Sequence, residues 1–417
     1  MLLKFSIENY LSIKEKIVLD MEATSDKENL ENLIEKNNSK YLKSVVLYGA
    51  NASGKSNVLS AFNIIVQFLV NSNNMQPGMK IPMIPFKFDS EYVDKPSSFE
   101  FEILVNDIKY RYGFKADINR VYEEYLYYSP NGRESKIFER RNVNEYYFTS
   151  EEKELKDIEN KNLENKLFLA TATTWNYDKT KPVYDFFTNN TTLLFDYRML
   201  EPVAFDLYSN DLNNSLKEFS LKILNEADMN ISKYEVKSLK MTDEQLLGLP
   251  PKLRERIPKD TKGYNITTSH KITDDNGVEK EVSLDFSEES LGTQNLFILN
   301  PFLMDVLQNG KVLIIDELDK SLHPFIVKYI VELFNSEEYN KNNAQLIFTT
   351  HDINLLNLNI LRRDQIWFTE KDYKKGSTDL YSLSDFSVRK TENVQKGYLN
   401  GRYGAIPYIS TDLGMWI

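Results

Sequence analysis

Residues 49–56 read Gly-Ala-Asn-Ala-Ser-Gly-Lys-Ser, which matches the phosphate-loop pattern G-x-x-x-x-G-K-[ST]. The apolar run Val45–Tyr48 before it predicts a buried strand, and the stretch Val58–Val70 after it predicts a helix. Glycines let the backbone curl so that successive N–H groups point at one anion, and the helix N-terminus adds its positive dipole end. The alternative is an ordinary glycine turn between a strand and a helix. The match at all four fixed positions favours a site for nucleotide phosphates.

Two side chains of the loop have chemistry that suits this site. Lys55 can reach the β- and γ-phosphates, and the hydroxyl of Ser56 can hold Mg²⁺. We therefore expect the nucleotide to be ATP with Mg²⁺ and the loop to supply these contact residues: Gly49, Asn51, Ala52, Ser53, Gly54, Lys55, Ser56 and Asn57.

Composition places the chain among ordinary globular proteins. It has 417 residues, 41% of them hydrophobic and 27% charged, which is enough chain for two or three domains. There is no cysteine, which excludes disulfides, thiolate metal sites and cysteine nucleophiles and suits a reducing cytosol. The N-terminus lacks the features of a signal peptide, and no segment approaches the ~18 apolar residues that span a bilayer. We therefore expect a cytoplasmic protein with no membrane partner.

The net charge of −11 bears on nucleic-acid binding. Proteins that coat DNA without sequence preference present a basic surface, because phosphate neutralisation drives that binding. The charge therefore argues against a general DNA-coating protein. A local basic groove, or DNA held through a partner, stays open as an alternative.

A second part of the site is predicted at residues 312–317. The apolar residues Val312–Ile315 are typical of a central parallel strand, and Asp316 and Glu317 follow at its carboxyl end. Ligands bind at that end of the strands in open α/β sheets. Asp316 can hold Mg²⁺, and Glu317 can act as the general base for the attacking water. The alternative is a strand that ends in a solvated acidic turn.

Two further segments repeat this layout. Gln345–Thr350 predicts a strand with His351 at its tip, where the ring can bond the γ-phosphate and detect its presence. The alternative role is a histidine at a helix start. Ser290 and Gly292 open a predicted helix, where a hydroxyl and backbone N–H groups can contact a phosphate. Taken alone, that pair is better explained by an ordinary capped helix start.

The rest of the chain divides into three parts. Residues 1–128 hold the phosphate loop and alternate from Ile81 to Tyr128 like an antiparallel sheet, with a turn at Asn106-Asp107. Residues 129–262 read as an α-rich insertion that either completes the core or forms a partner-binding arm. Residues 263–417 begin with a hairpin around Asp274–Gly277 and return to alternating strands and helices.

The order of these motifs resembles ABC-type ATPases of the SMC, RecF and OLD group. Residues 49–56 look like their Walker A motif, Asp316-Glu317 like Walker B and His351 like the switch histidine. Residues 290–294 resemble the signature motif, with leucine where its first glycine usually sits, and residues 321–324 resemble the D-loop. The resemblance implies an α/β fold: an ABC-type P-loop ATPase with a mixed parallel core sheet, an antiparallel β subdomain and an α-rich insertion.

A narrower resemblance is to RloA/AbiL-like ATPases of phage-defence and abortive-infection operons. It is carried by Ser290–Gln294, by residues 316–324 and by Gly401–Pro407. It implies hydrolysis of ATP by a homodimer or higher even oligomer, in which Ser290 and Gly292 contact ATP held by the partner's Lys55. It also implies a separate effector, a nuclease or a toxin. The alternatives are a RecF-like clamp on DNA and a scaffold that binds ATP and barely hydrolyses it.

Overall fold

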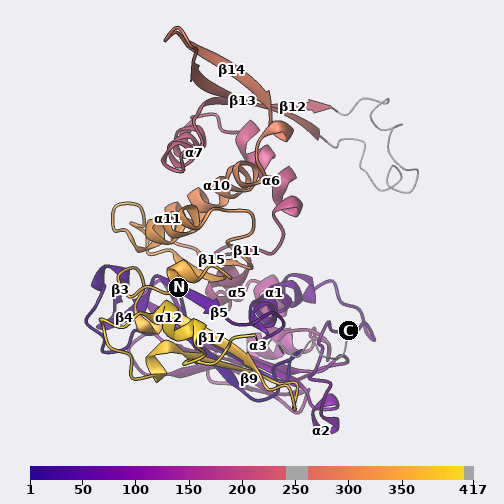
Figure 1. The fold of residues 1–417 in the computed structure, drawn as a ribbon. Coiled ribbons are helices and arrows are strands. Elements are labelled where there is room, and N and C mark those ends of the chain that lie inside the picture. Colours follow the sequence, from indigo (N-terminus) through magenta and orange to yellow (C-terminus); the bar gives the residue numbers. More distant parts are fainter. Residues whose placement is uncertain (241–261, 408–417) are drawn as a thin grey trace, which may run out of the picture. The chain divides into compact units, whose positions relative to one another are not determined.

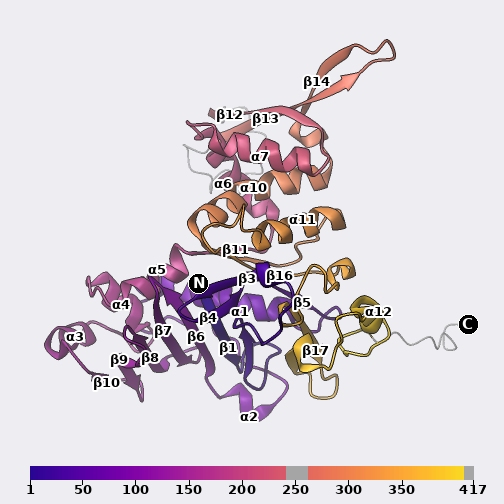
Figure 2. The same cartoon turned by 90° about the vertical axis from the view of Figure 1, so that its left-hand side faces the viewer.

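The computed structural model describes residues 1–240 and 262–407. The chain forms two compact units. The first comprises Met1–Leu193, Leu307–Leu318 and Ile330–Ile417, and the second comprises Leu194–Val306 and Asp319–Tyr329. Each unit is described by itself below. Figures 1 and 2 show the elements of both.

A six-stranded sheet forms the centre of the first unit, in the order β11-β15-β16-β5-β17-β18. The four strands β15, β16, β5 and β17 are parallel, and β18 is antiparallel to β17. β5, β15 and β16 are buried at every position, as expected for strands with both faces covered. The strands are β5 (Ser44–Tyr48), β11 (Thr191–Leu194), β15 (Val312–Ile315), β16 (Gln345–Thr349), β17 (Ile366–Lys371) and β18 (Thr378–Ser382).

A seven-stranded antiparallel sheet has the order β10-β9-β8-β7-β6-β1-β2. Helix α1 (Lys55–Ser72) packs on it, with Phe62 edge-on against Phe5 and Phe101 and with Phe68 against Phe114. The helix that starts at the phosphate loop is therefore anchored by aromatic side chains. The strands are β1 (Leu2–Glu8), β2 (Ile17–Asp20), β6 (Ser97–Val105), β7 (Ile108–Ala116), β8 (Val121–Ser129), β9 (Ser135–Arg141) and β10 (Glu145–Phe148).

Smaller elements complete the first unit. They are strands β3 (Leu33–Lys36) and β4 (Ser39–Leu42) and helices α2 (Ser90–Val93), α3 (Glu152–Glu159), α4 (Phe168–Thr174), α5 (Lys181–Thr188) and α12 (Val394–Leu399), with the end of α11 (Pro324–Asn335).

A buried carboxylate fastens α4 to the antiparallel sheet. Glu124 of β8 is fully buried and accepts hydrogen bonds from the N–H groups of Phe168 (2.6 Å) and Leu169 (2.9 Å) and from the Tyr112 hydroxyl (3.1 Å). Burial raises the pKa of the Glu124 carboxyl, and the charge of Arg140 opposes that rise. Because these bonds satisfy N–H groups at the start of α4, the helix is held on the sheet.

The second unit pairs helices with a three-stranded antiparallel sheet, β12-β13-β14. Pro301 in α10 cannot donate to the carbonyl of Phe297, and the Tyr208 hydroxyl donates to that carbonyl instead, at 2.8 Å. The Tyr208 and Phe297 rings stack at 4.3 Å, so α6 and α10 share one buried contact. The elements are α6 (Tyr197–Ser209), α7 (Ser215–Glu226), α10 (Leu291–Asn309, to Val306 in this unit), β12 (Ile231–Lys240), β13 (Lys262–Thr273) and β14 (Glu279–Asp285).

The fold class predicted from the sequence is confirmed: the chain is α/β, with a mixed core sheet, antiparallel sheets and helices. The turn at Asn106-Asp107 joins β6 to β7, with both residues at positive φ. Within the stretch Ile81–Tyr128, which the sequence predicts to be antiparallel sheet, the first strand begins only at Ser97.

The three-part division differs from the two units. The sequence predicts an insertion that starts at residue 129, whereas the first unit runs without interruption to Leu193. The segment 129–262, which the sequence predicts to be α-rich, also contains strands: β9 and β10 extend the antiparallel sheet to Phe148, and β12 lies in the second unit. Within that segment, the glycine and proline residues of Gly248–Pro251 and Ile257-Pro258 predict breaks in the helical pattern, and both stretches lie outside the described residues.

Within residues 1–240 and 262–407, the structure contains no helix with the length and apolar character needed to cross a lipid bilayer.

Candidate nucleotide site

The phosphate loop is a tight turn that only glycine fits at two places. A Cβ on Gly49 would lie 2.4 Å from the Ser53 Oγ atom and 2.5 Å from the Thr369 carbonyl oxygen. Gly54 has φ +112°, and a Cβ there would lie 2.3 Å from the Thr378 Oγ1 atom. Both glycines are therefore required by the path of the loop, which fits a cradle for phosphates.

The loop leads directly into helix α1. Gly54 occupies the N-cap position, and no side chain caps the helix. The N–H groups of the first helical turn have no partner within an ideal helix, and they point out of its N-terminus. The start of α1 thus combines backbone donors with the positive end of the helix dipole, which suits an anion.

Lys55 begins α1 and is folded back into the loop. Its side chain is only 7% exposed, and Nζ donates to the carbonyl oxygens of Gly49 (2.8 Å) and Ala50 (3.2 Å). The ammonium group is thus held inside the ring of loop backbone, next to the predicted phosphates. Ser56 and Asn51 are exposed at the same loop, so both can contact a ligand from solvent.

The phosphate loop is also hydrogen-bonded by a group of hydroxyls that the sequence pattern does not identify. Ser53 Oγ lies 2.6 Å from Thr369 Oγ1, and Thr378 Oγ1 donates to the Ser53 carbonyl at 2.8 Å. Ser12 Oγ lies 2.7 Å from Thr378 Oγ1 and accepts from the Asn57 amide at 2.7 Å. Three of these four contacts join residues more than 300 positions apart, so no local sequence pattern marks them.

The two acids at the end of β15 are linked through a third residue. Thr349, the last residue of β16, has no exposed surface. Its Oγ1 donates to Asp316 Oδ1 at 2.6 Å and accepts from the Glu317 N–H at 2.7 Å. Glu317 itself has a left-handed backbone with φ +54°, an uncommon conformation for a residue with a long side chain. Thr349 therefore holds the Asp316 carboxylate and the backbone of Glu317.

The register of the sheet places these residues at one edge. Ile315 pairs with Phe348, and Phe348 pairs with Val46, all in parallel strands. Asp316 and the loop after Tyr48 therefore follow at the same edge. Because neighbouring strands are about 4.8 Å apart and one strand intervenes, β15 lies about 10 Å from β5. The edge thus brings the loop and the acids within reach of one triphosphate.

His351 follows β16 at this edge and is exposed. The next residue, Asp352, accepts a hydrogen bond at its carbonyl oxygen from the Tyr48 hydroxyl, at 2.8 Å. Tyr48 is the residue directly before the phosphate loop, so the segment after the histidine is tied to the strand that carries the loop.

The predicted signature residues lie in the second unit, at the start of α10. Ser290 Oγ accepts from the Thr293 N–H at 3.1 Å and therefore caps the helix, as the ordinary structural role requires. A Cβ on Gly292 would lie 2.8 Å from the Ser321 carbonyl, so this glycine allows the segment that resembles the D-loop to approach. Leu291 between them is 67% exposed. Their proposed role towards ATP stays a prediction.

Comparisons with known proteins bear on the fold and the family. Residues 44–357 match a family model described as "AAA domain, putative AbiEii toxin, Type IV TA system". No curated protein is similar enough to count as a match.

The solved structures that are similar to the chain include the following three. The SMC head domain from Thermotoga maritima is 13% identical, covers 91% of this chain and 98% of its own, and has a TM-score of 0.42. The SMC head domain from Pyrococcus furiosus, bound to the C-terminal domain of ScpA, is 13% identical, with coverages of 91% and 96% and a TM-score of 0.40. The cbiO1 protein from Clostridium perfringens, part of the cbiONQ ABC transporter complex, is 10% identical, with both coverages at 96% and a TM-score of 0.34.

Proposed function

The chain belongs to the AAA family that matches residues 44–357, and on that premise we propose that it hydrolyses ATP as a dimeric switch in defence against phage. The observation that carries the proposal is the convergence of the phosphate loop, the two acids and the histidine on one edge of the parallel sheet. The family description names a toxin–antitoxin context, which supports the defence role.

The residues present suit ATP with Mg²⁺. The loop has the glycine-only turns and the helix N-terminus that a triphosphate needs, and Lys55 supplies a cation. Ser56 and Asp316 are oxygen donors, the ligand type that Mg²⁺ prefers, and they would hold it. When bound, the ion would neutralise charge on the phosphates during transfer.

Glu317 is the proposed general base. Its exposed side chain follows directly on Asp316, so the carboxylate can accept a proton from water beside the terminal phosphate. The left-handed backbone, held by the Thr349 hydroxyl, sets the direction in which this carboxylate points. His351 would donate to the γ-phosphate and report its presence.

The proposal that the chain acts as a dimer rests on its resemblance to ABC-type ATPases. In such a dimer, Ser290 and Gly292 of one chain would face Lys55 of another. Two damaged chains test it: one with Lys55→Ala and one with Ser290→Arg, each expected to be inactive alone. Random pairing in an equal mixture makes half the dimers mixed, each with one intact site, so about a quarter of the wild-type rate returns. If the mixture recovers no activity although both variants are folded and the Ser290→Arg chain still binds ATP, the sites are not shared between chains.

The effector clause is tested with a chain that cannot hydrolyse its ATP. Glu317→Gln is expected to hold the ATP-bound dimer, and a nuclease or toxin copurifies with it from the native host. Full defence by this chain alone, with no effector recovered, contradicts the clause. The RecF-like alternative requires DNA binding that depends on ATP and falls steeply with salt, and the net charge of −11 opposes it.

A further inference from the structure

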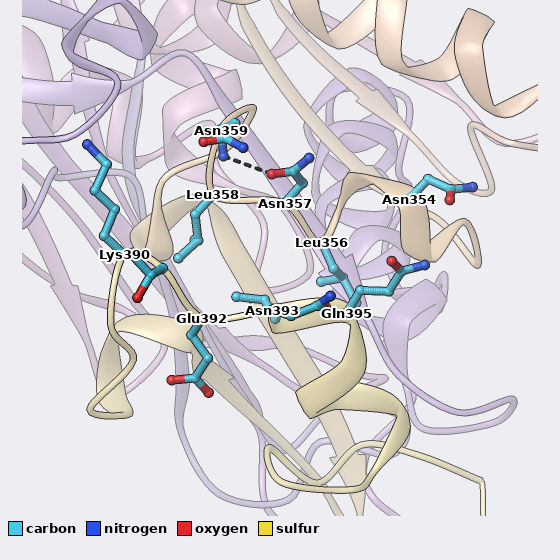
Figure 3. A pocket seen from close by; sticks show the side chains of 11 residues that line it. Asn354, Leu356, Asn357, Leu358, Asn359, Lys390, Glu392, Asn393 and Gln395 are labelled. Atoms are coloured by element: carbon cyan, nitrogen blue, oxygen red, sulfur yellow. Dashed lines mark hydrogen bonds between the residues drawn. The ribbon is translucent and has the colours of Figure 1, made fainter.

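A cavity of about 400 Å³ lies in the first unit, apart from the phosphate loop. Its walls are the segment 354–359, which follows His351, and the segment 390–395, which leads into α12 (Figure 3). The volume falls in the range of small-ligand sites, about 300–1,000 Å³. Leu356 and Val394, both at most 2% exposed, give it an apolar base.

Carboxamide side chains dominate the lining: Asn354, Asn357, Asn359, Asn393 and Gln395. Asn357 uses its Oδ1 atom to accept from the Asn359 N–H, and Asn393 uses its Oδ1 atom to cap α12 at the Lys396 N–H. Within the part of the chain that the structure describes, the NH₂ groups of these two amides donate no hydrogen bond. They are donors that a ligand can use.

The charged groups of the lining are already neutralised. Lys390 Nζ lies 2.5 Å from a carboxylate oxygen of Glu28. Glu392 accepts from the Tyr403 hydroxyl at 2.8 Å and forms an ion pair with Arg402. The cavity therefore offers hydrogen bonds without net charge, which disfavours phosphates, nucleotides and strongly charged peptides as ligands.

We propose that this cavity binds an uncharged stretch of peptide from a partner protein. A carboxamide carries the same donor and acceptor groups as a peptide bond, so the amide groups of Asn357 and Asn393 complement a peptide main chain. The apolar base at Leu356 and Val394 accommodates one apolar side chain of that peptide.

Both walls of the cavity connect to Tyr48, the residue before the phosphate loop. The Tyr48 hydroxyl bonds the Asp352 carbonyl, two residues before Asn354, and the Tyr48 ring packs at 6.0 Å against Tyr398 of α12. A peptide in the cavity and a nucleotide at the phosphate loop therefore both act on the position of the Tyr48 side chain. The inference that nucleotide and peptide binding are coupled rests on the proposed function, whereas the inference that the cavity binds a peptide does not.

The probe for the binding clause is a displayed library of random dodecapeptides, selected on the full chain without nucleotide. The variant Asn357→Trp fills the cavity from an exposed position, and Asn74→Trp, at an exposed asparagine outside the cavity, is the matched control. Selected peptides are expected to bind Asn357→Trp about tenfold or more weakly and to bind Asn74→Trp like the wild type. Selection of no peptide, or equal binding to Asn357→Trp, overturns the inference.

The coupling clause is read from the same peptides with and without ATP and Mg²⁺. Nucleotide is expected to change peptide affinity by about 5- to 150-fold. Tyr48→Phe, which keeps the ring and removes the hydroxyl, is expected to reduce that factor, measured as the ratio of its own peptide affinities with and without nucleotide. If the chain binds peptide in the cavity but hydrolyses no ATP, only the proposed function is contradicted. ATP hydrolysis with no effect of nucleotide on the peptide would remove the coupling alone.

Discussion

Thr349→Val is the most informative single substitution in the proposed site. Valine has nearly the shape of threonine, so the buried position stays filled while the hydroxyl is lost. The change removes the hydrogen bond to Asp316 Oδ1 and leaves the Glu317 N–H without its acceptor. Both acids then lose the contact that fixes their direction.

The size of the effect follows from these two bonds. A hydrogen bond to a charged group contributes about 1.5–3 kcal/mol, and one from a neutral N–H contributes about 0.5–1.5 kcal/mol. The left-handed backbone of Glu317 costs about 1–2 kcal/mol and has less support once the hydroxyl is gone. If about 3 kcal/mol of this is felt in the transition state, kcat for ATP hydrolysis falls roughly a hundredfold.

The assay is steady-state phosphate release with ATP and Mg²⁺, combined with nucleotide affinity and thermal melting. We expect the affinity for ATP to change little, because the phosphate loop is untouched. Thr349→Ser keeps a hydroxyl and is expected to restore most of kcat. Thr350→Val is the matched control, since Thr350 is also buried but its hydroxyl accepts from the Asp352 N–H instead. Wild-type kcat in Thr349→Val, or an equal loss in Thr350→Val, refutes the positioning role.

Three further predictions concern the loop and the stability of each unit. Gly54→Ala is expected to weaken ATP binding more than tenfold, because the new Cβ clashes with Thr378. Gly132→Ala, also at positive φ but with nothing within 4 Å of the new Cβ, is the control and is expected to leave ATP binding unchanged. Affinities are measured by titration of a fluorescent nucleotide, and equal values for the two variants contradict the role of the loop as a phosphate cradle. Tyr208→Phe removes the donor to the carbonyl left by Pro301 and is expected to lower the free energy of unfolding by about 1–3 kcal/mol; an unchanged urea midpoint contradicts this. Because burial raises the pKa of Glu124, the contribution of this residue to stability is fully present below the ordinary glutamate pKa and is lost as the pH rises through the raised value. Glu124→Gln is therefore expected to flatten the pH dependence of the free energy of unfolding. Glu123→Gln, at a less buried neighbour, is expected to leave that pH dependence as in the wild type.

The elements next to the phosphate loop were predictable because their signals are local. Buried parallel strands have continuous apolar runs, and both β5 and β15 could be located from such runs. The motif at residues 49–56 fixes the turn between β5 and α1. The helix was nevertheless predicted to start at Val58, whereas it begins at Lys55, since helix starts depend on cap geometry rather than on apolar spacing.

The division into units was harder to predict because it depends on long-range contacts. Residues after 129 look helical by composition, yet β9 and β10 pair into the antiparallel sheet, and Glu124 fastens α4 to it. A buried glutamate that serves a helix 44 residues away leaves no mark in the local pattern.

The support for the site could not be read from the sequence for the same reason. Thr349 looks like one more residue of an apolar strand, and its role appears only when β15 and β16 are paired. Thr378 reaches the phosphate loop from 325 residues away. The residues that carry the chemistry have motifs, whereas the residues that position them are set by strand order.

The most direct test of the central claim compares single-turnover phosphate release by the wild type and by Glu317→Gln, with ATP binding measured on the same samples. Both proteins are expected to bind ATP with Mg²⁺ equally well, and the substitution is expected to slow phosphate release by at least about a hundredfold, the contribution of a general base. Equal rates of release in the two proteins, or a wild-type chain that binds no ATP, would contradict the central claim.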